Sequence, residues 1–212
     1  MNPLISVHVA KAGGTSVKAL LQAAYGHGLA EDYADNPANP LSQRILAPNF
    51  YMSRNELLPA GASCVHGHFH PGKYAIQRGT AMFTMLRYPV DNIMSIYWFW
   101  KSFSQGTEPL HAFFLENDLT VIETARLPIL RYLFSVSYFG GFDMGRFDII
   151  GRHEDRETAL TKLSCLIETP LDVHTRENIT AQSEERKQME SDPWLRRRLE
   201  DILKEDIRFY ER

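Results

Sequence analysis

A turn near the N-terminus constrains the fold of this chain more than any other feature of its sequence. An apolar, strand-like segment is followed by a lysine, two glycines and two hydroxyl residues, and then by a segment with helical spacing. These residues are Lys11, Gly13, Gly14, Thr15 and Ser16. Backbone amides at such a turn point toward one place, where the helix dipole adds partial positive charge to that of the lysine. The pattern predicts an anion site, in particular a phosphate site, at residues 11 to 16.

The order of these residues excludes the loop of nucleoside triphosphatases. That loop places four residues between its first glycine and a Gly-Lys-Ser/Thr triplet whose hydroxyl holds magnesium. Here Lys11 precedes the glycines. A glycine-rich turn can also serve only to close a tight connection, and this alternative stays open.

A second segment carries another candidate anion site. An apolar run ends at Arg87, and Pro89 follows at the position where prolines start helices. Helical spacing then places Asp91, Asn92 and Ser95 on a more polar side, so that Arg87 and Ser95 can converge beyond the strand end. The arginine fork gives a phosphate two charge-assisted hydrogen bonds, and the serine adds a neutral donor. The alternative is a locally paired arginine and a solvated serine.

Together the two segments resemble the sulfotransferases that use 3'-phosphoadenosine-5'-phosphosulfate (PAPS). The first resembles their 5'-phosphosulfate loop, and the second resembles their 3'-phosphate site. The resemblance implies that PAPS is the co-substrate, that no metal takes part, and that the donor is bound by Lys11, Gly13, Gly14, Thr15, Ser16, Arg87 and Ser95. Two departures stand out. Tyr88 replaces an aspartate that would cap the following helix, which predicts a weaker helix start, and Ala10 and Ala12 replace a proline and a threonine.

Three histidines alternate at the end of a predicted strand over residues 63 to 69. They are His66, His68 and His70, and alternation places them on one face if the strand runs one residue further. Such histidines are candidates for a metal site, for core or capping positions, or for a general base, because much of an imidazole is neutral near pH 7. The His-Gly-His pair resembles the uronyl 2-O-sulfotransferase branch. This resemblance implies that His68 is the base and His66 its assistant or alternative.

Alternating patterns predict an α/β fold with a P-loop-like central parallel sheet and helices on both faces. We expect one domain over residues 1–212. The predicted strands cover residues 4–9, 63–69, 80–86 and 147–151. The predicted helices cover residues 14–25, 89–104, 155–167 and 193–209, with shorter helices in the aromatic stretch from 109 to 138.

Two further stretches have open interpretations. The segment from Gly26 to Pro59 contains four prolines and no sustained period, so it is either a lid or acceptor-binding loop or a plain surface excursion. The aromatic cluster Trp98, Phe99, Trp100 and Phe103 could line an acceptor pocket or belong to the core.

Composition narrows the classes of function. The net charge of −3 argues against general nucleic-acid binding. No apolar run approaches the roughly 20 residues that span a bilayer, and no secretory signal pattern is seen, so a cytoplasmic location is expected. Cys64 and Cys165 are far apart and outside any ligand spacing, so both are expected in the core. Oligomeric state stays open.

The predicted function is transfer of a sulfuryl group from PAPS to a hydroxyl of a small molecule or carbohydrate. In this hypothesis His68 takes the hydroxyl proton, while Lys11 and the turn stabilise the departing 5'-phosphate. Two other hypotheses remain at this point: an ATP-dependent small-molecule phosphotransferase, and a nucleotide-binding protein on the same fold without catalytic activity.

Overall fold

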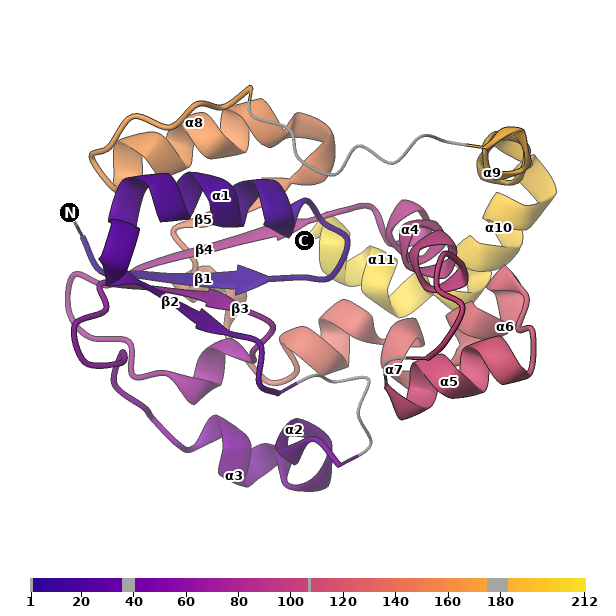
Figure 1. Ribbon diagram of the computed structural model, residues 1–212, viewed down its shortest axis with the longest axis horizontal. Coiled ribbons are helices and arrows are strands. Elements are labelled where there is room, and N and C mark those ends of the chain that lie inside the picture. The colour runs from indigo at the N-terminus through magenta and orange to yellow at the C-terminus, as the bar shows by residue number, and fades with distance from the viewer. Residues whose placement is uncertain (1, 36–40, 107, 175–182) are drawn as a thin grey trace.

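A parallel sheet forms the centre of the protein. The computed structural model describes residues 2–35, 41–106, 108–174 and 183–212. In sheet order, the five strands are β2 (Leu29–Asp32), β3 (Cys64–Gly67), β1 (Leu4–His8), β4 (Ala81–Leu86) and β5 (Ile149–Arg152), and each neighbouring pair is parallel. Their carboxyl ends therefore meet at one edge of the sheet (Figure 1). The predicted α/β fold with a P-loop-like parallel sheet is confirmed.

Helices cover both faces of this sheet. One face is covered by α1 (Gly14–Tyr25) and α8 (Arg156–Leu166), and Figure 1 shows the two lying side by side above the strands. The other face packs against a larger group of helices. This group consists of α4 (Pro89–Lys101), α5 (Pro109–Glu116), α6 (Val121–Arg126), α7 (Pro128–Arg131), the π-helical η3 (Leu133–Tyr138), α10 (Pro193–Ile202) and α11 (Lys204–Glu211).

The central strands β1 and β4 are largely buried on both sides because helices cover both faces of the sheet. In β1, Leu4 packs with α1 and α8, whereas Ile5 and Val7 pack with the larger helix group. The same alternation puts the polar residues Ser6 and His8 of β1 on the α1 side. The sheet thus carries buried polar groups directly beneath the predicted anion-binding turn.

The predicted strand over residues 63–69 ends early. β3 stops at Gly67. Its partner β2 ends at the same level, because Asp32, the last residue of β2, pairs with Gly67. His70 instead lies at the N-cap of the short helix η2 (Pro71–Lys73). Only His66 therefore lies on the strand, and the expectation of three alternating histidines on one strand face is wrong for His68 and His70.

Other boundaries follow the prediction to different degrees. α1 spans residues 14 to 25 as predicted, and the helix predicted over 155–167 is α8, which follows η5 (His153–Asp155). The helix predicted over 193–209 divides into α10 and α11 around Leu203. Helix α9 (Glu184–Ser191) was not predicted.

Cys64 is buried as expected, but Cys165 is exposed.

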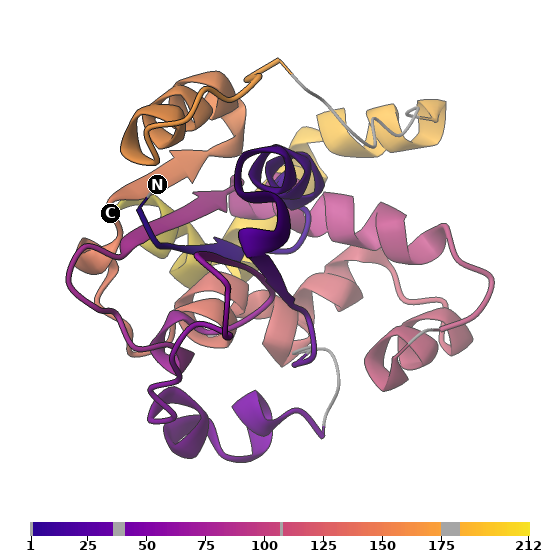
Figure 2. The same cartoon turned by 60° about the vertical axis from the view of Figure 1, so that its left-hand side comes forward.

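The segment from residue 26 to residue 59 contains more structure than its composition suggests. It holds η1 (Gly26–Gly28), β2, α2 (Gln43–Leu46) and α3 (Pro48–Met52). In both views α2 and α3 lie beyond the sheet, on the side away from α1 and α8 (Figures 1 and 2). Within the described ranges, no helix has the length and apolar character needed to cross a membrane.

Candidate active site

The turn after β1 has the backbone that an anion site requires. Gly13 is the N-cap of α1 and has a φ of 89°, in the left-handed region that favours glycine. A side chain at Gly14 would meet the ring of His8 at 1.8 Å, so close packing of the turn on β1 depends on this glycine. No side chain caps α1, and its first turn holds no acidic residue. The first turn of α1 thus carries neither a side-chain cap nor a carboxylate that would compete with an anion.

Lys11 is placed on this turn with its ammonium group turned toward α4. Its φ of 60° is also left-handed, and its Nζ lies 4.2 Å from the centre of the Phe99 ring. Burial lowers the pKa of Lys11, and the charges of Arg186 and Arg87 lower it further. Thr15, in the first turn of α1, is exposed, and Ser16 is buried. The turn thus brings together the predicted residues around one positive group.

Arg87 follows β4 directly and is partly buried at the same sheet edge. Burial lowers the pKa of its guanidinium, while the nearby carboxylates Asp91 and Glu190 raise it. Within the described part of the chain, neither Arg87 nor Lys11 forms an ion pair with a carboxylate. Because β1 and β4 are neighbours in the sheet, the two predicted anion sites lie at adjacent strand ends.

The polar residues of α4 contact different neighbours: Asp91 pairs with Arg196 of α10 at 2.7 Å, and Asn92 contacts the β1–α1 turn. Ser95 and Asn92 are both buried. The Asn92 side-chain amide donates a 2.9 Å hydrogen bond to the carbonyl of Ala10. This contact ties the helix that follows Arg87 to the turn that carries Lys11.

Arg186 is a third cation at this edge, and sequence reasoning missed it. It lies on α9, and its charge lowers the pKa of both Lys11 and Arg87. Its Nε lies 2.7 Å from a carboxylate oxygen of Glu190, four residues further along the helix. The sequence gives no signal for this placement, because it depends on how α9 packs against α4.

The predicted weakness at the start of α4 is relieved from elsewhere in the chain. Tyr88 is the N-cap residue of α4 and supplies no side-chain cap. Its backbone amide instead donates to Glu154 Oε1 at 2.9 Å, and Tyr210 donates to the other oxygen of Glu154 at 3.0 Å. A carboxylate from the segment after β5 thus binds the amide of the N-cap residue itself, whereas an N-cap aspartate would bind the amides two or three residues further on.

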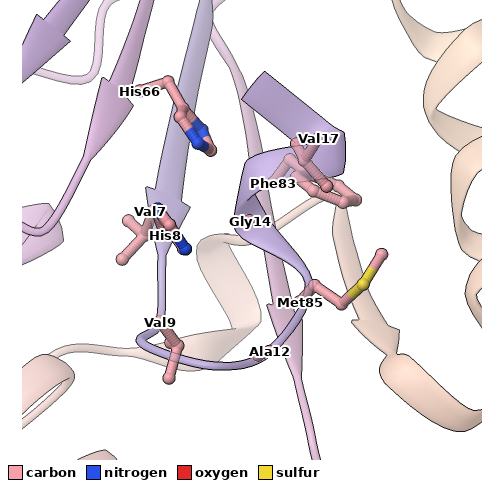
Figure 3. A pocket seen from close by; sticks show the side chains of 9 residues that line it. All are labelled: Val7, His8, Val9, Ala12, Gly14, Val17, His66, Phe83 and Met85. Carbon is pink, nitrogen blue, oxygen red and sulfur yellow. The ribbon is translucent and has the colours of Figure 1, made fainter. Parts of the chain in front are cut away.

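Three histidine rings stack behind the turn. His66 of β3 lies 5.2 Å from His8 of β1 between ring centres, and His8 lies 4.4 Å from His68. His66 Nδ1 is 2.8 Å from Ser6 Oγ, and His8 Nδ1 is 2.9 Å from the Tyr33 hydroxyl. Figure 3 shows His8 and His66 beside a small cavity of about 10 Å³ under the turn. Sequence reasoning singled out His66 and His68 but not His8.

The stack is held in the neutral state. Burial lowers the pKa of His66 to about 3, and it lowers the pKa of His8 well below the ordinary value. Burial also lowers the pKa of His68, and the positive charge of Arg44 lowers it further. Near pH 7 these rings are therefore unprotonated, which is the form a general base requires.

His68 has a defined tautomer. Its Nδ1 lies 2.6 Å from the carbonyl oxygen of His8, and a carbonyl can only accept, so Nδ1 carries the proton. The Tyr138 hydroxyl is 3.0 Å from the same nitrogen. In the neutral ring the lone pair is therefore on Nε2. His68 thus presents an unprotonated nitrogen on the side of the ring opposite the His8 carbonyl.

His70 is occupied by local structure. Its Nε2 donates to the carbonyl of Gly140 at 3.0 Å, and its Nδ1 accepts from the amide of Gly72 at 3.0 Å. Both ring nitrogens are used, so His70 matches the capping interpretation. Within the described residues, no group of three or more histidine, cysteine, aspartate or glutamate side chains is arranged to hold a metal ion.

The aromatic cluster at the end of α4 belongs only in part to the core. Trp98 and Trp100 pack against the core, whereas Phe99 and Phe103 are 45% and 38% exposed. Their rings meet edge to face at 5.0 Å. Phe99 also contacts the Lys11 ammonium, so the exposed pair lies beside the anion-binding turn.

The chain was compared with known proteins at three levels. No protein-family model and no curated protein matches it. A solved sulfotransferase from Alicyclobacillus acidocaldarius matches all of this chain and 99% of its own, with 16% identity and a TM-score of 0.46. The mouse sulfotransferase SULT7A1, complexed with PAP, matches 90% of this chain at 11% identity and a TM-score of 0.40, and the match spans 63% of the mouse chain. Values this low transfer neither an activity nor a ligand to this chain.

Proposed function

We propose that this protein is a PAPS-dependent sulfotransferase that moves a sulfuryl group to an acceptor hydroxyl. One observation carries the proposal: Lys11 and Arg87 lie at adjacent strand ends, are partly buried, and form no ion pair within the described chain. Leaving charges partly out of water without a carboxylate in direct contact is unfavourable unless an anion joins them. Two separate cations suit a ligand with anionic groups at both ends, as PAPS has.

The residues of the site fit such a donor. We assign the 5'-phosphosulfate end to Lys11 and to the start of α1, namely Gly13, Gly14, Thr15 and Ser16, where no side chain caps the helix. We assign the 3'-phosphate to Arg87 and Ser95, with Arg186 as a further cation. The Asn92 contact with Ala10 keeps the two ends of the site in a fixed relation.

The proposed chemistry is carried by His68. PAPS supplies an activated sulfur whose leaving group is 3'-phosphoadenosine 5'-phosphate (PAP). His68 Nε2 accepts the acceptor's hydroxyl proton while the hydroxyl oxygen bonds to sulfur and the bond from sulfur to the 5'-phosphate oxygen breaks. Lys11 and the turn amides then stabilise the negative charge that develops on that phosphate oxygen.

His66 has a supporting part in this proposal. It is buried, its Nδ1 is joined to Ser6, and its ring stacks on His8, which in turn stacks on His68. This position supports the assistant role over the alternative of a second base. We propose a small molecule or a carbohydrate as the acceptor, on the strength of the His66-Gly67-His68 motif.

Calorimetric titration tests the donor site directly. PAP should bind more tightly than 5'-AMP or ATP, and Arg87→Ala should remove the preference for the 3'-phosphorylated ligand. Equal affinity for PAP and 5'-AMP in the wild type would contradict the assignment. An acceptor screen with labelled PAPS then separates an enzyme from a protein that binds PAP without transferring sulfate. Strict magnesium dependence with ATP turnover would instead favour a phosphotransferase.

A further inference from the structure

Arg44 is a buried arginine in a segment that composition describes as loop-like. It lies in α2, and only 6% of its surface is exposed. Its guanidinium donates to two backbone carbonyls, those of His68 and, at 3.0 Å, Ser137. Its Nε lies 3.3 Å from Asp35 Oδ2, which supplies the opposite charge. Burial of an arginine is costly unless such partners compensate for lost hydration.

The carbonyl partner of Arg44 belongs to the proposed base. His68 lies just beyond the end of β3, where ladder hydrogen bonds no longer fix the backbone. Arg44 holds this residue through its carbonyl, and the His8 carbonyl holds the ring through Nδ1. Tyr138 joins the two groups, because its ring lies 5.3 Å from the guanidinium and its hydroxyl 3.0 Å from His68 Nδ1.

We propose that Arg44 is a positioning residue for His68 and that it sets the orientation from which His68 Nε2 receives the acceptor proton. The inference rests on the proposed function, and it assigns the segment between β2 and β3 a part in catalysis. Arginine suits this place because its planar fork reaches two carbonyls and a carboxylate in different directions. A lysine ammonium cannot reproduce that geometry.

Arg44 also affects the charge state of His68. Its positive charge and burial both disfavour the imidazolium, so the pKa of His68 stays low. Removal of the arginine charge should therefore raise the pKa of His68 and move the acidic limb of the rate profile to higher pH. The titratable and charged groups that surround His68 are His8, His66, Tyr33, Tyr138 and Arg44.

Two substitutions separate the hydrogen-bonding geometry of the Arg44 guanidinium from its positive charge. Arg44→Gln removes the guanidinium and the charge, whereas Arg44→Lys keeps the charge and loses the planar guanidinium. Arg54→Gln is a matched control, because Arg44 and Arg54 both lie over the Tyr51 ring, at 5.8 and 5.7 Å, but Arg54 pairs with Glu56 on a more exposed surface. Circular dichroism identifies any variant that fails to fold.

The test combines NMR titration of His68 with pH-dependent kinetics. Both Arg44 variants should lose about tenfold or more in kcat, with PAP affinity and the KM for PAPS within about twofold of wild type. The His68 pKa and the acidic limb should rise in Arg44→Gln and stay near wild type in Arg44→Lys, and Arg54→Gln should change none of these.

Wild-type kcat in both folded Arg44 variants, or an unchanged His68 titration in Arg44→Gln, would overturn the proposal. A loss of kcat matched by an equal loss of PAP affinity would also overturn it, because the role would then be structural. If the wild type binds no PAP, the proposed function fails, and the NMR titration still decides whether Arg44 controls His68.

Discussion

Replacing Gly14 by alanine tests whether the anion-binding turn and the histidine stack form one packed unit. The new Cβ would lie 1.8 Å from both Cδ2 and Nε2 of His8. Atoms in ordinary contact are about 3.5 to 4 Å apart, so the His8 ring would have to move by roughly 1.5 to 2 Å. The ring has little room, because His66 and His68 stack with it and Tyr33 is bonded to it at 2.9 Å.

The size of the effect follows from these contacts. Overpacking of this kind costs about 1 to 3 kcal/mol, and loss of the His8–Tyr33 hydrogen bond costs about 1 kcal/mol more. The greater helix preference of alanine returns about 0.5 to 1 kcal/mol. We therefore expect a net destabilisation of about 1 to 3.5 kcal/mol, which lowers the Tm by roughly 2 to 14 °C in a chain of this size.

Urea unfolding of a double-mutant cycle measures the coupling. Gly14→Ala should be destabilising in the wild-type background and nearly neutral in a His8→Ala background, where the clashing ring is gone. If Gly14→Ala is as stable as the wild type, or costs the same with and without His8, the turn does not pack on the stack as described.

The remaining predictions concern the anion site and pH. Arg87→Ala should weaken PAP binding by about 10- to 100-fold and leave 5'-AMP binding unchanged in calorimetry, since a charge-assisted phosphate contact is lost; equal losses for both ligands would place the 3'-phosphate elsewhere. Lys11→Met should lower kcat more than it raises the KM for PAPS, because its charge acts on the leaving phosphate; a change in KM alone would refute that role. The folded-state pKa values of His8, His66 and His68 are lowered, so the stability that their neutral forms contribute is complete above pH of about 6.5 and is lost as the pH falls below it. Thermal unfolding at a series of pH values should show this loss, and a Tm that is flat from pH 7 to pH 4 would contradict it.

The parts of the fold that the sequence predicted well have local causes. The start of α1 follows from a strand, a glycine turn and helical spacing in immediate succession, and the structure places that helix at Gly14–Tyr25. The start of α4 follows from Pro89, which fits the first helical position. Both candidate anion sites were predicted because each is contained within one short segment.

The parts that were not predicted depend on strand order and long-range packing. His8 became a site residue only because β3 lies next to β1, and no local pattern specifies that pairing. Arg186 reaches the anion site from α9, about a hundred residues after Arg87. Arg44 looks like an ordinary loop cation in the sequence, and its importance follows from contacts with His68 and Ser137.

The contact between Lys11 and Phe99 has a thermodynamic consequence for any anion that enters the site. The ammonium already has a partner at 4.2 Å, and a cation over an aromatic face is stabilised by about 0.5 to 1 kcal/mol near the surface. When a phosphate binds, the ammonium loses its contact with the ring and gains a contact with the phosphate. The binding free energy measured in a titration is therefore the difference between these two interactions. Phe99 therefore acts as an internal competitor, and trimming its ring should tighten anion binding even though it removes a contact.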